Sequence, residues 1–206
     1  MIKANRQTLP LWFFDKYFSI LQKILFREVE FRLEGTVPDG PVLLLQNHFS
    51  WWDGYWSFVA TEKVMKRRFH VMMLEKELAR RKFLSRTGAF SIDPEGRNVL
   101  PSMRYSSNIL KDPRNSVTIY PQGRLISHYA GRVVFEKGAE ALLRIAGAPV
   151  NVVFAAAHVS YGSPVRPRAT IFLKHFEQGL CSTQDLEAAY NAFYLESRDL
   201  VIRSEV

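Results

Sequence analysis

Short runs of aliphatic and β-branched residues alternate with amphipathic stretches along most of this chain. The short runs are typical of strands, and the longer stretches have the apolar spacing of helices. The predicted strands are VEFRLEG, residues 42–45, FHVMML, GAFSID, VTIY, VNVVFAAA and ATIFLKH. The predicted helices are residues 53–67, EKELARRKFLSRTG (closed by Gly88), residues 98 to about 110, 136–146 and 183–203. This alternation predicts an α/β domain, in which a mostly parallel or mixed sheet is flanked by helices on both faces.

The size and composition of the chain agree with one ordered domain. Its 206 residues can bury a full hydrophobic core but leave little room for a second domain. With 47% hydrophobic and 23% charged residues, the chain belongs with folded proteins. The net charge of +8 favours an acidic partner such as anionic lipid, nucleic acid or a phosphorylated cofactor. No nucleic-acid-binding motif is recognised, so we expect no nucleic-acid partner.

Cysteine and histidine spacing argues against metal and thiol chemistry. Cys181 is the single cysteine, which excludes an internal disulfide and a metal site of several cysteines and fits a reducing compartment. Its neighbours in GLCSTQ supply no base or positive charge, so we do not expect a nucleophilic thiol. The five histidines have no close paired spacing, so we expect no metal.

Residues 9–26, LPLWFFDKYFSILQKILF, predict an amphipathic helix ahead of the domain. No apolar run reaches the roughly 18 to 20 residues of a transmembrane helix. One side carries Asp15, Lys16, Ser19, Gln22, Lys23 and Arg27, and the other carries Leu11, Trp12, Phe14, Phe18, Leu21 and Leu25. Such a helix either lies in a membrane interface or packs on the protein's own core. The first interpretation divides the chain into a membrane-interface helix, 1–28, and a domain, 29–206.

Polar residues follow the ends of three predicted strands: His48, Asp93 and Gln122. Ligands bind beyond the carboxyl ends of strands in α/β sheets. His48 and Asp53 are five residues apart, and on one continuous helix such residues point about 140° apart. They meet only if His48 lies in the turn before the helix, where a carboxylate would make the imidazole a better base. Ser50 and Asp53 equally fit a capping box, so the spacing leaves a catalytic pair and a capped helix both open.

Four blocks, in order, resemble the glycerolipid acyltransferase family, which includes bacterial 1-acylglycerol-3-phosphate acyltransferases. NHFSWWD resembles the NHxxxxD motif, and KEL at 76–78 with the following FLSRTGAFSID resembles the second block. YPQGRL at 120–125 resembles the third block, usually Phe-Pro-Glu-Gly-Thr-Arg. FEKGAEALLRIAGAPVNVVF at 135–154 resembles the fourth. The likeness spans roughly residues 30–160 and makes 29–206 the acyltransferase domain.

The resemblance implies acyl transfer from a thioester, either acyl-CoA or acyl carrier protein, to a hydroxyl. In this scheme His48 is the general base and Asp53 orients it and stabilises the imidazolium. The acceptor oxygen attacks the thioester directly, so the resemblance implies no covalent acyl-enzyme, no permanently bound cofactor and no metal. Residues implied to bind substrate are Arg97, Gln122, Gly123, Arg124 and Lys137.

The third block departs from the family pattern in a way that concerns the acceptor. Gln122 stands where glutamate is usual, and an amide both donates and accepts hydrogen bonds. Arg124-Leu125 replaces Thr-Arg. Pro94 stands where the family usually has an arginine, and Arg97 could take the place of that arginine. The favoured interpretation is an acceptor other than lysophosphatidate, such as a glycolipid. The alternatives are a lysophosphatidate acyltransferase of phospholipid synthesis and a non-catalytic lipid-binding relative.

A lipid acceptor has to be taken from a bilayer, so the resemblance favours the membrane-interface interpretation of the N-terminal helix. We expect a peripheral protein on the cytoplasmic face, with membrane lipids as partners. Two basic clusters are candidates for anionic headgroups or an acidic carrier protein. They are Lys63, Lys66, Arg67 and Arg68, and Arg80, Arg81, Lys82 and Arg86.

Overall fold

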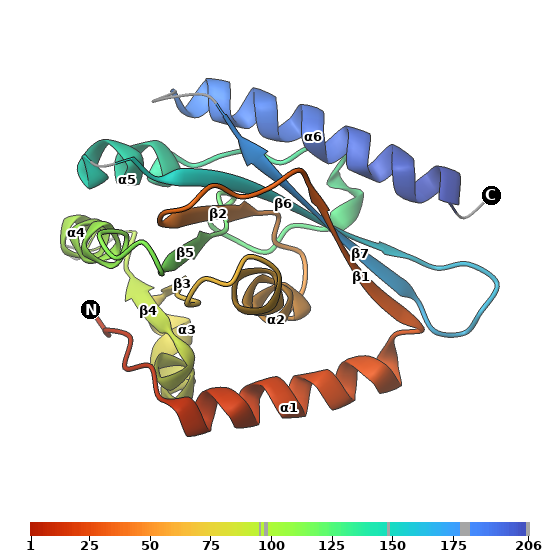
Figure 1. Ribbon diagram of the computed structural model, residues 1–206, viewed down its shortest axis with the longest axis horizontal. Coiled ribbons are helices and arrows are strands. Elements are labelled where there is room, and N and C mark those ends of the chain that lie inside the picture. Colours follow the sequence, from red (N-terminus) through yellow and green to blue (C-terminus); the bar gives the residue numbers. More distant parts are fainter. Residues whose placement is uncertain (95, 97–98, 148, 178–181, 205–206) are drawn as a thin grey trace.

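The computed structural model describes residues 1–94, 96, 99–147, 149–177 and 182–204, and these form one α/β domain (Figure 1). Within this part of the chain seven strands form a single sheet in the order β1-β7-β6-β2-β5-β3-β4. The strands are β1 (Glu28–Glu34), β2 (Val42–Gln46), β3 (Val71–Leu74), β4 (Ala89–Ile92), β5 (Ser116–Ile119), β6 (Asn151–Ser160) and β7 (Arg168–Phe176). The predicted fold class is confirmed.

The sheet is mixed because β7 follows its neighbour β6 without a crossover helix. β6 and β7 are joined by a short loop and pair antiparallel, whereas every other pair of neighbouring strands is parallel. A parallel pair needs a crossover of a dozen or more residues, while a short loop can only return the chain antiparallel. The parallel order places the carboxyl ends of β2 and β5 side by side, since Leu45 pairs with Ile119.

Helices cover both faces of the sheet. They are α1 (Thr8–Leu25), α2 (Trp52–Val59) with a π-helical turn (Ala60–Val64), α3 (Glu75–Arg80), α4 (Val99–Ile109), α5 (Gly138–Ala146) and α6 (Thr183–Ser204). Successive side chains of β2 alternate between the faces. Val42 and Leu44 pack in a core with α1, α2 and α3, and Leu43 and Leu45 in a second core with α4, α5 and α6. Figure 1 shows α1 and α2 on one side of the sheet and α5 and α6 on the other.

The segment EKELARRKFLSRTG is not one helix, contrary to the sequence prediction. α3 ends at Arg80, the backbone of Arg81 leaves the helical region, and a separate 3₁₀ turn spans Lys82–Thr87. β3 and β4 are four residues long, about 13 Å. A continuous helix over 75–87 would extend about 20 Å. That is longer than the strands themselves, so the helix would carry the chain past the point where β4 has to begin. Gly88 closes this turn as predicted, with φ 118°, where a Cβ would lie 2.4 Å from the Phe69 carbonyl oxygen.

The predicted N-terminal helix is present as α1, and its predicted faces are right only in part: Leu11, Phe14 and Phe18 pack inward as one set, whereas Trp12 and Leu25 are exposed. Phe14 makes edge-to-face ring contacts with Tyr55 and Phe58 of α2. The polar residues Asp15 and Gln22 also face α2, where Asp15 accepts a hydrogen bond from Tyr55 and Gln22 accepts one from Trp56. The outer side exposes a different apolar set: Leu9, Trp12, Phe13, Tyr17, Ile20, Ile24 and Leu25. Periodicity could not separate these sides, because α1 carries apolar residues around most of its circumference.

No helix within the described residues is both long and apolar enough to cross a membrane.

Candidate active site

The turn between β2 and α2 carries the central residues of the site. β2 is a fully buried apolar strand, so it fixes Asn47 and His48 at the carboxyl edge of the sheet. The Asn47 side chain donates to the Ala157 carbonyl oxygen at 2.9 Å and accepts from the Ala157 N–H at 2.8 Å. Its backbone N–H donates to the Tyr190 hydroxyl at 2.8 Å. These bonds continue the pairing of β2 with β6 for one more residue and hold the turn in place.

His48 and Asp53 are brought together by this turn. The His48 Nδ1 lies 2.9 Å from Asp53 Oδ2. The same oxygen accepts the backbone N–H groups of Phe49 and Ser50, each at 2.7 Å, and the Ser50 hydroxyl accepts the N–H of Trp52 at 3.0 Å. Asp53 therefore meets the histidine and also satisfies N–H groups in the turn that leads into α2. The two interpretations that the spacing left open hold at once.

Burial and hydrogen bonding have opposite effects on the pKa of the Asp53 carboxyl group. Asp53 is fully buried, and this desolvation raises the pKa of its carboxyl group. The hydrogen bonds from His48, Ser50 and Phe49 favour the carboxylate and oppose that rise. A carboxylate beside Nδ1 keeps the proton on that nitrogen, which leaves Nε2 with a free lone pair. The His48 side chain is 24% exposed, and Nε2 makes no hydrogen bond within the described part of the chain.

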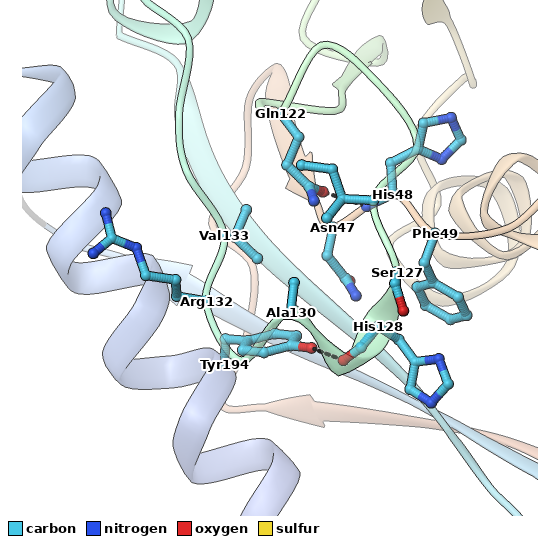
Figure 2. Close-up of a pocket in the computed structure, with 11 residues that line it drawn as sticks. Asn47, His48, Phe49, Gln122, Ser127, His128, Ala130, Arg132, Val133 and Tyr194 are labelled. Carbon is cyan, nitrogen blue, oxygen red and sulfur yellow. Dashed lines mark hydrogen bonds between the residues drawn. The ribbon is translucent and has the colours of Figure 1, made fainter.

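The segment after β5 clamps the backbone of His48. The Gln122 Oε1 accepts the His48 N–H at 2.6 Å, and the His48 carbonyl oxygen accepts the N–H of Ile126 at 2.9 Å. Figure 2 shows Gln122 reaching the His48 backbone across the hollow that these residues line. The orientation of the Gln122 amide is settled, because only its oxygen can accept from an N–H donor. Gln122, which the family resemblance implies to bind substrate, contacts the backbone of His48 in the structure.

Tyr120 is a residue of the site that sequence analysis missed. Its ring stacks on the His48 imidazole, with centroids 4.1 Å apart and planes inclined by 16°. Its hydroxyl lies 3.2 Å from the hydroxyl of Ser57 on α2. The sequence signal for Tyr120 is its place directly after a strand, two residues before Gln122. The contact with His48 depends on the register between β2 and β5, which no local pattern records.

The other predicted site residues are spread around this centre. Gly123 has φ 65° and makes the turn in which its N–H donates to the Tyr120 carbonyl oxygen. Arg124 is exposed, with no hydrogen bond or ion pair to another described residue. Lys137 is the exposed N-cap of α5 and lines a separate cavity of about 570 Å³. Arg97 lies outside the described residues, as does Cys181.

Two cavities adjoin the loop that follows Gln122. The hollow beside His48 is small, about 10 Å³, and holds roughly one water-sized group. Arg132 lines this hollow and also the cavity of about 570 Å³, which has the size of a small-molecule site. In the described ranges no three His, Cys, Asp or Glu side chains gather in a way that could hold a metal ion.

Comparison with known proteins adds one match. The model of a protein family described as Acyltransferase matches residues 28–160, which is more than half of the chain. The matched range contains β1 to β6, His48, Asp53 and the clamp after β5. No curated protein matches the chain.

Proposed function

This chain belongs to the glycerolipid acyltransferase family, and from that premise we propose that it is a peripheral membrane O-acyltransferase. It moves an acyl group from acyl-CoA or acyl carrier protein to a hydroxyl of a lipid. The observation that carries the proposal is the contact of His48 Nδ1 with Asp53 Oδ2, which leaves Nε2 of this partly exposed side chain without a partner among the described residues. A general base needs this arrangement, in which one nitrogen is fixed and the other meets the substrate.

The proposed reaction is a direct transfer. Nε2 of His48 takes the proton from the acceptor hydroxyl as its oxygen attacks the thioester carbonyl carbon. The imidazolium that forms is stabilised by Asp53. The tetrahedral intermediate then expels the thiolate, which receives a proton from the imidazolium, and the products are an ester and a free thiol. His48 ends in its starting state.

The contact of Gln122 bears on the choice of acceptor. The bond from the His48 N–H needs only an acceptor oxygen, and a glutamate or a glutamine side chain supplies one equally well. The exchange of glutamate for glutamine therefore leaves this clamp intact and does not by itself argue for an unusual acceptor. We propose a lipid hydroxyl as the acceptor class, with lysophosphatidate and glycolipids as the two kinds to compare.

The outer face of α1 supports membrane association. Its exposed apolar residues, given above, form a stripe beside Lys16 and Lys23, which are also exposed. Aromatic and aliphatic groups suit the headgroup and upper acyl region of a bilayer, and the lysines suit anionic headgroups. We propose that α1 lies flat on the cytoplasmic face of a membrane, where soluble acyl thioesters can reach the site.

The test of the function is an acyl-transfer assay. The purified protein is given radiolabelled acyl-CoA or acyl carrier protein and vesicles that contain lysophosphatidate, a glycolipid or another hydroxyl lipid. We expect a labelled ester with at least one acceptor and release of one thiol per ester. If the protein binds these vesicles but forms no ester with any donor and acceptor, it is a non-catalytic lipid-binding relative.

Substitutions on the outer face of α1 test the membrane proposal. Phe13 and Ile20 are 58% and 60% exposed, so changing both to asparagine should leave the fold intact. We expect at least about tenfold weaker binding to anionic vesicles, because two apolar side chains no longer enter the bilayer. The measurement is vesicle co-sedimentation with thermal unfolding as a check of the fold. A matched control is Ile202→Asn on α6, where the isoleucine is 55% exposed. Equal binding by the double variant and the control would refute anchoring through this face.

A further inference from the structure

The stacking of Tyr120 on His48 is a close contact that the reaction scheme above does not use. The Tyr120 side chain lies face to face with the imidazole, and its hydroxyl meets Ser57 on the helix that also carries Asp53. α2 therefore carries both groups that act on the imidazole. The Asp53 carboxylate contacts its edge, and the Ser57 hydroxyl holds the Tyr120 ring against its face. The bond to Asp53 restrains the imidazole at Nδ1 only, and a ring stacked on its face adds a restraint on rotation of the whole imidazole plane.

We propose that Tyr120 is a positioning residue for the transfer reaction: its ring holds the plane of the His48 imidazole and stabilises the imidazolium that forms when Nε2 takes a proton. The inference rests on the proposed function. The face of an aromatic ring attracts a cation and has little effect on a neutral group, so this contact strengthens as the reaction proceeds. An interaction that strengthens in this way raises kcat more than it changes KM.

The ring of Tyr120, and not its hydroxyl, supplies this effect. Burial, and then the nearby negative charge of Asp53, raise the pKa of Tyr120. The Tyr120 hydroxyl therefore stays protonated at neutral pH. It points toward Ser57 on α2, while the ring faces the His48 imidazole. A phenylalanine at position 120 should therefore support catalysis, whereas an aliphatic side chain should not.

Other charged or titratable groups near His48 stay the same in such variants. They are Asp53 on α2, and His128, Arg132 and Tyr194, which line the hollow beside the turn. Differences among variants at position 120 therefore report the ring itself.

The experiment compares Tyr120→Phe with Tyr120→Leu, and with phenylalanine analogues of increasing ring fluorination placed at position 120. We expect Tyr120→Phe to keep kcat within about threefold, and Tyr120→Leu to lower kcat on the order of tenfold with a smaller change in KM. The fluorinated series should lower kcat stepwise, because fluorine withdraws charge from the ring face while the shape is nearly kept. This series also replaces Tyr120→Leu if that variant does not fold. Unchanged kcat across the fluorinated series would overturn the proposal, as would wild-type kcat in a folded Tyr120→Leu.

An NMR measurement separates this inference from the proposed function. The His48 imidazole signals are followed against pH in Tyr120→Phe and in the most fluorinated variant. We expect the imidazolium to lose its proton at a lower pH in the fluorinated variant, by roughly half a pH unit. Identical titrations would refute stabilisation by the ring even if the enzyme is active. A shift without acyl transfer in the wild type would keep the stacking effect and reject the proposed function.

Discussion

His48→Ala should lower acyl transfer by at least about 10³-fold, since the variant loses the group that is proposed to take the proton of the acceptor hydroxyl. The His48 side chain is 24% exposed and stacks on Tyr120, so its loss also removes some buried contact, and the stability of the variant has to be measured beside its activity. Its backbone bonds to Gln122 and Ile126 remain available in an alanine variant. The measurement is kcat for ester formation with the best acceptor of the panel, together with the midpoint of thermal unfolding.

Two controls make the result specific. Binding of His48→Ala to vesicles should equal that of the wild type, because α1 and not His48 is proposed to meet the bilayer. His175→Ala removes another histidine, from β7, which takes no part in the site. It should keep wild-type turnover. Transfer by His48→Ala at the wild-type rate would exclude His48 as the general base, and an equal loss in His175→Ala would point to a general effect on the fold.

Asp53→Asn is expected to lower kcat on the order of 10³-fold with a small change in stability. The amide oxygen can still accept the N–H groups of Phe49 and Ser50, so the start of α2 keeps its hydrogen bonds. All three contacts use Oδ2, so an amide oxygen in its place still meets Nδ1 of His48 but carries no negative charge to make the imidazole a better base or to stabilise the imidazolium. The same exchange in the triad of serine proteases costs about 10⁴-fold. The measurement compares kcat with the midpoint of thermal unfolding.

Asp53→Ala separates the two tasks of this residue. Its loss leaves the N–H groups of Phe49 and Ser50 without their acceptor at the buried start of α2. We expect this variant to lose activity like Asp53→Asn and also to lose about 1–3 kcal/mol in free energy of unfolding. If Asp53→Asn kept full activity while Asp53→Ala lost stability, Asp53 would serve only the helix and the proposed pair would be wrong.

The fold class was predictable because it depends on patterns that each segment carries. Runs such as VNVVFAAA are apolar on both sides apart from Asn151, which is typical of strands covered on both faces. The boundaries of α4, α5, α6 and most strands lie within a few residues of the prediction. The segment 75–87 failed because local propensity favours a helix throughout, while the distance between β3 and β4 allows only a shorter path.

The site was predictable only in part. His48 and Asp53 are near in sequence, and a strand followed by a capped helix implied the turn in which they could meet. The contacts of Gln122 and Tyr120 with His48 join residues more than 70 positions apart. They depend on β2 and β5 being neighbours, a pairing that the sequence pattern does not specify. Asp93 also follows a strand, but β4 lies at the edge of the sheet, beyond β5 and β3.

The sequence by itself determined which segments become strands and helices, which residue could be the base, and which family the blocks resemble. Those properties follow from side-chain chemistry and from spacing over a few residues. Only the tertiary structure decided that Asp53 both caps α2 and contacts His48, that the third block clamps the histidine, and that α1 turns Asp15 and Gln22 inward. These outcomes depend on which elements pack together, since a side chain acquires its partner only when strand order and helix packing bring distant residues within hydrogen-bonding or stacking distance.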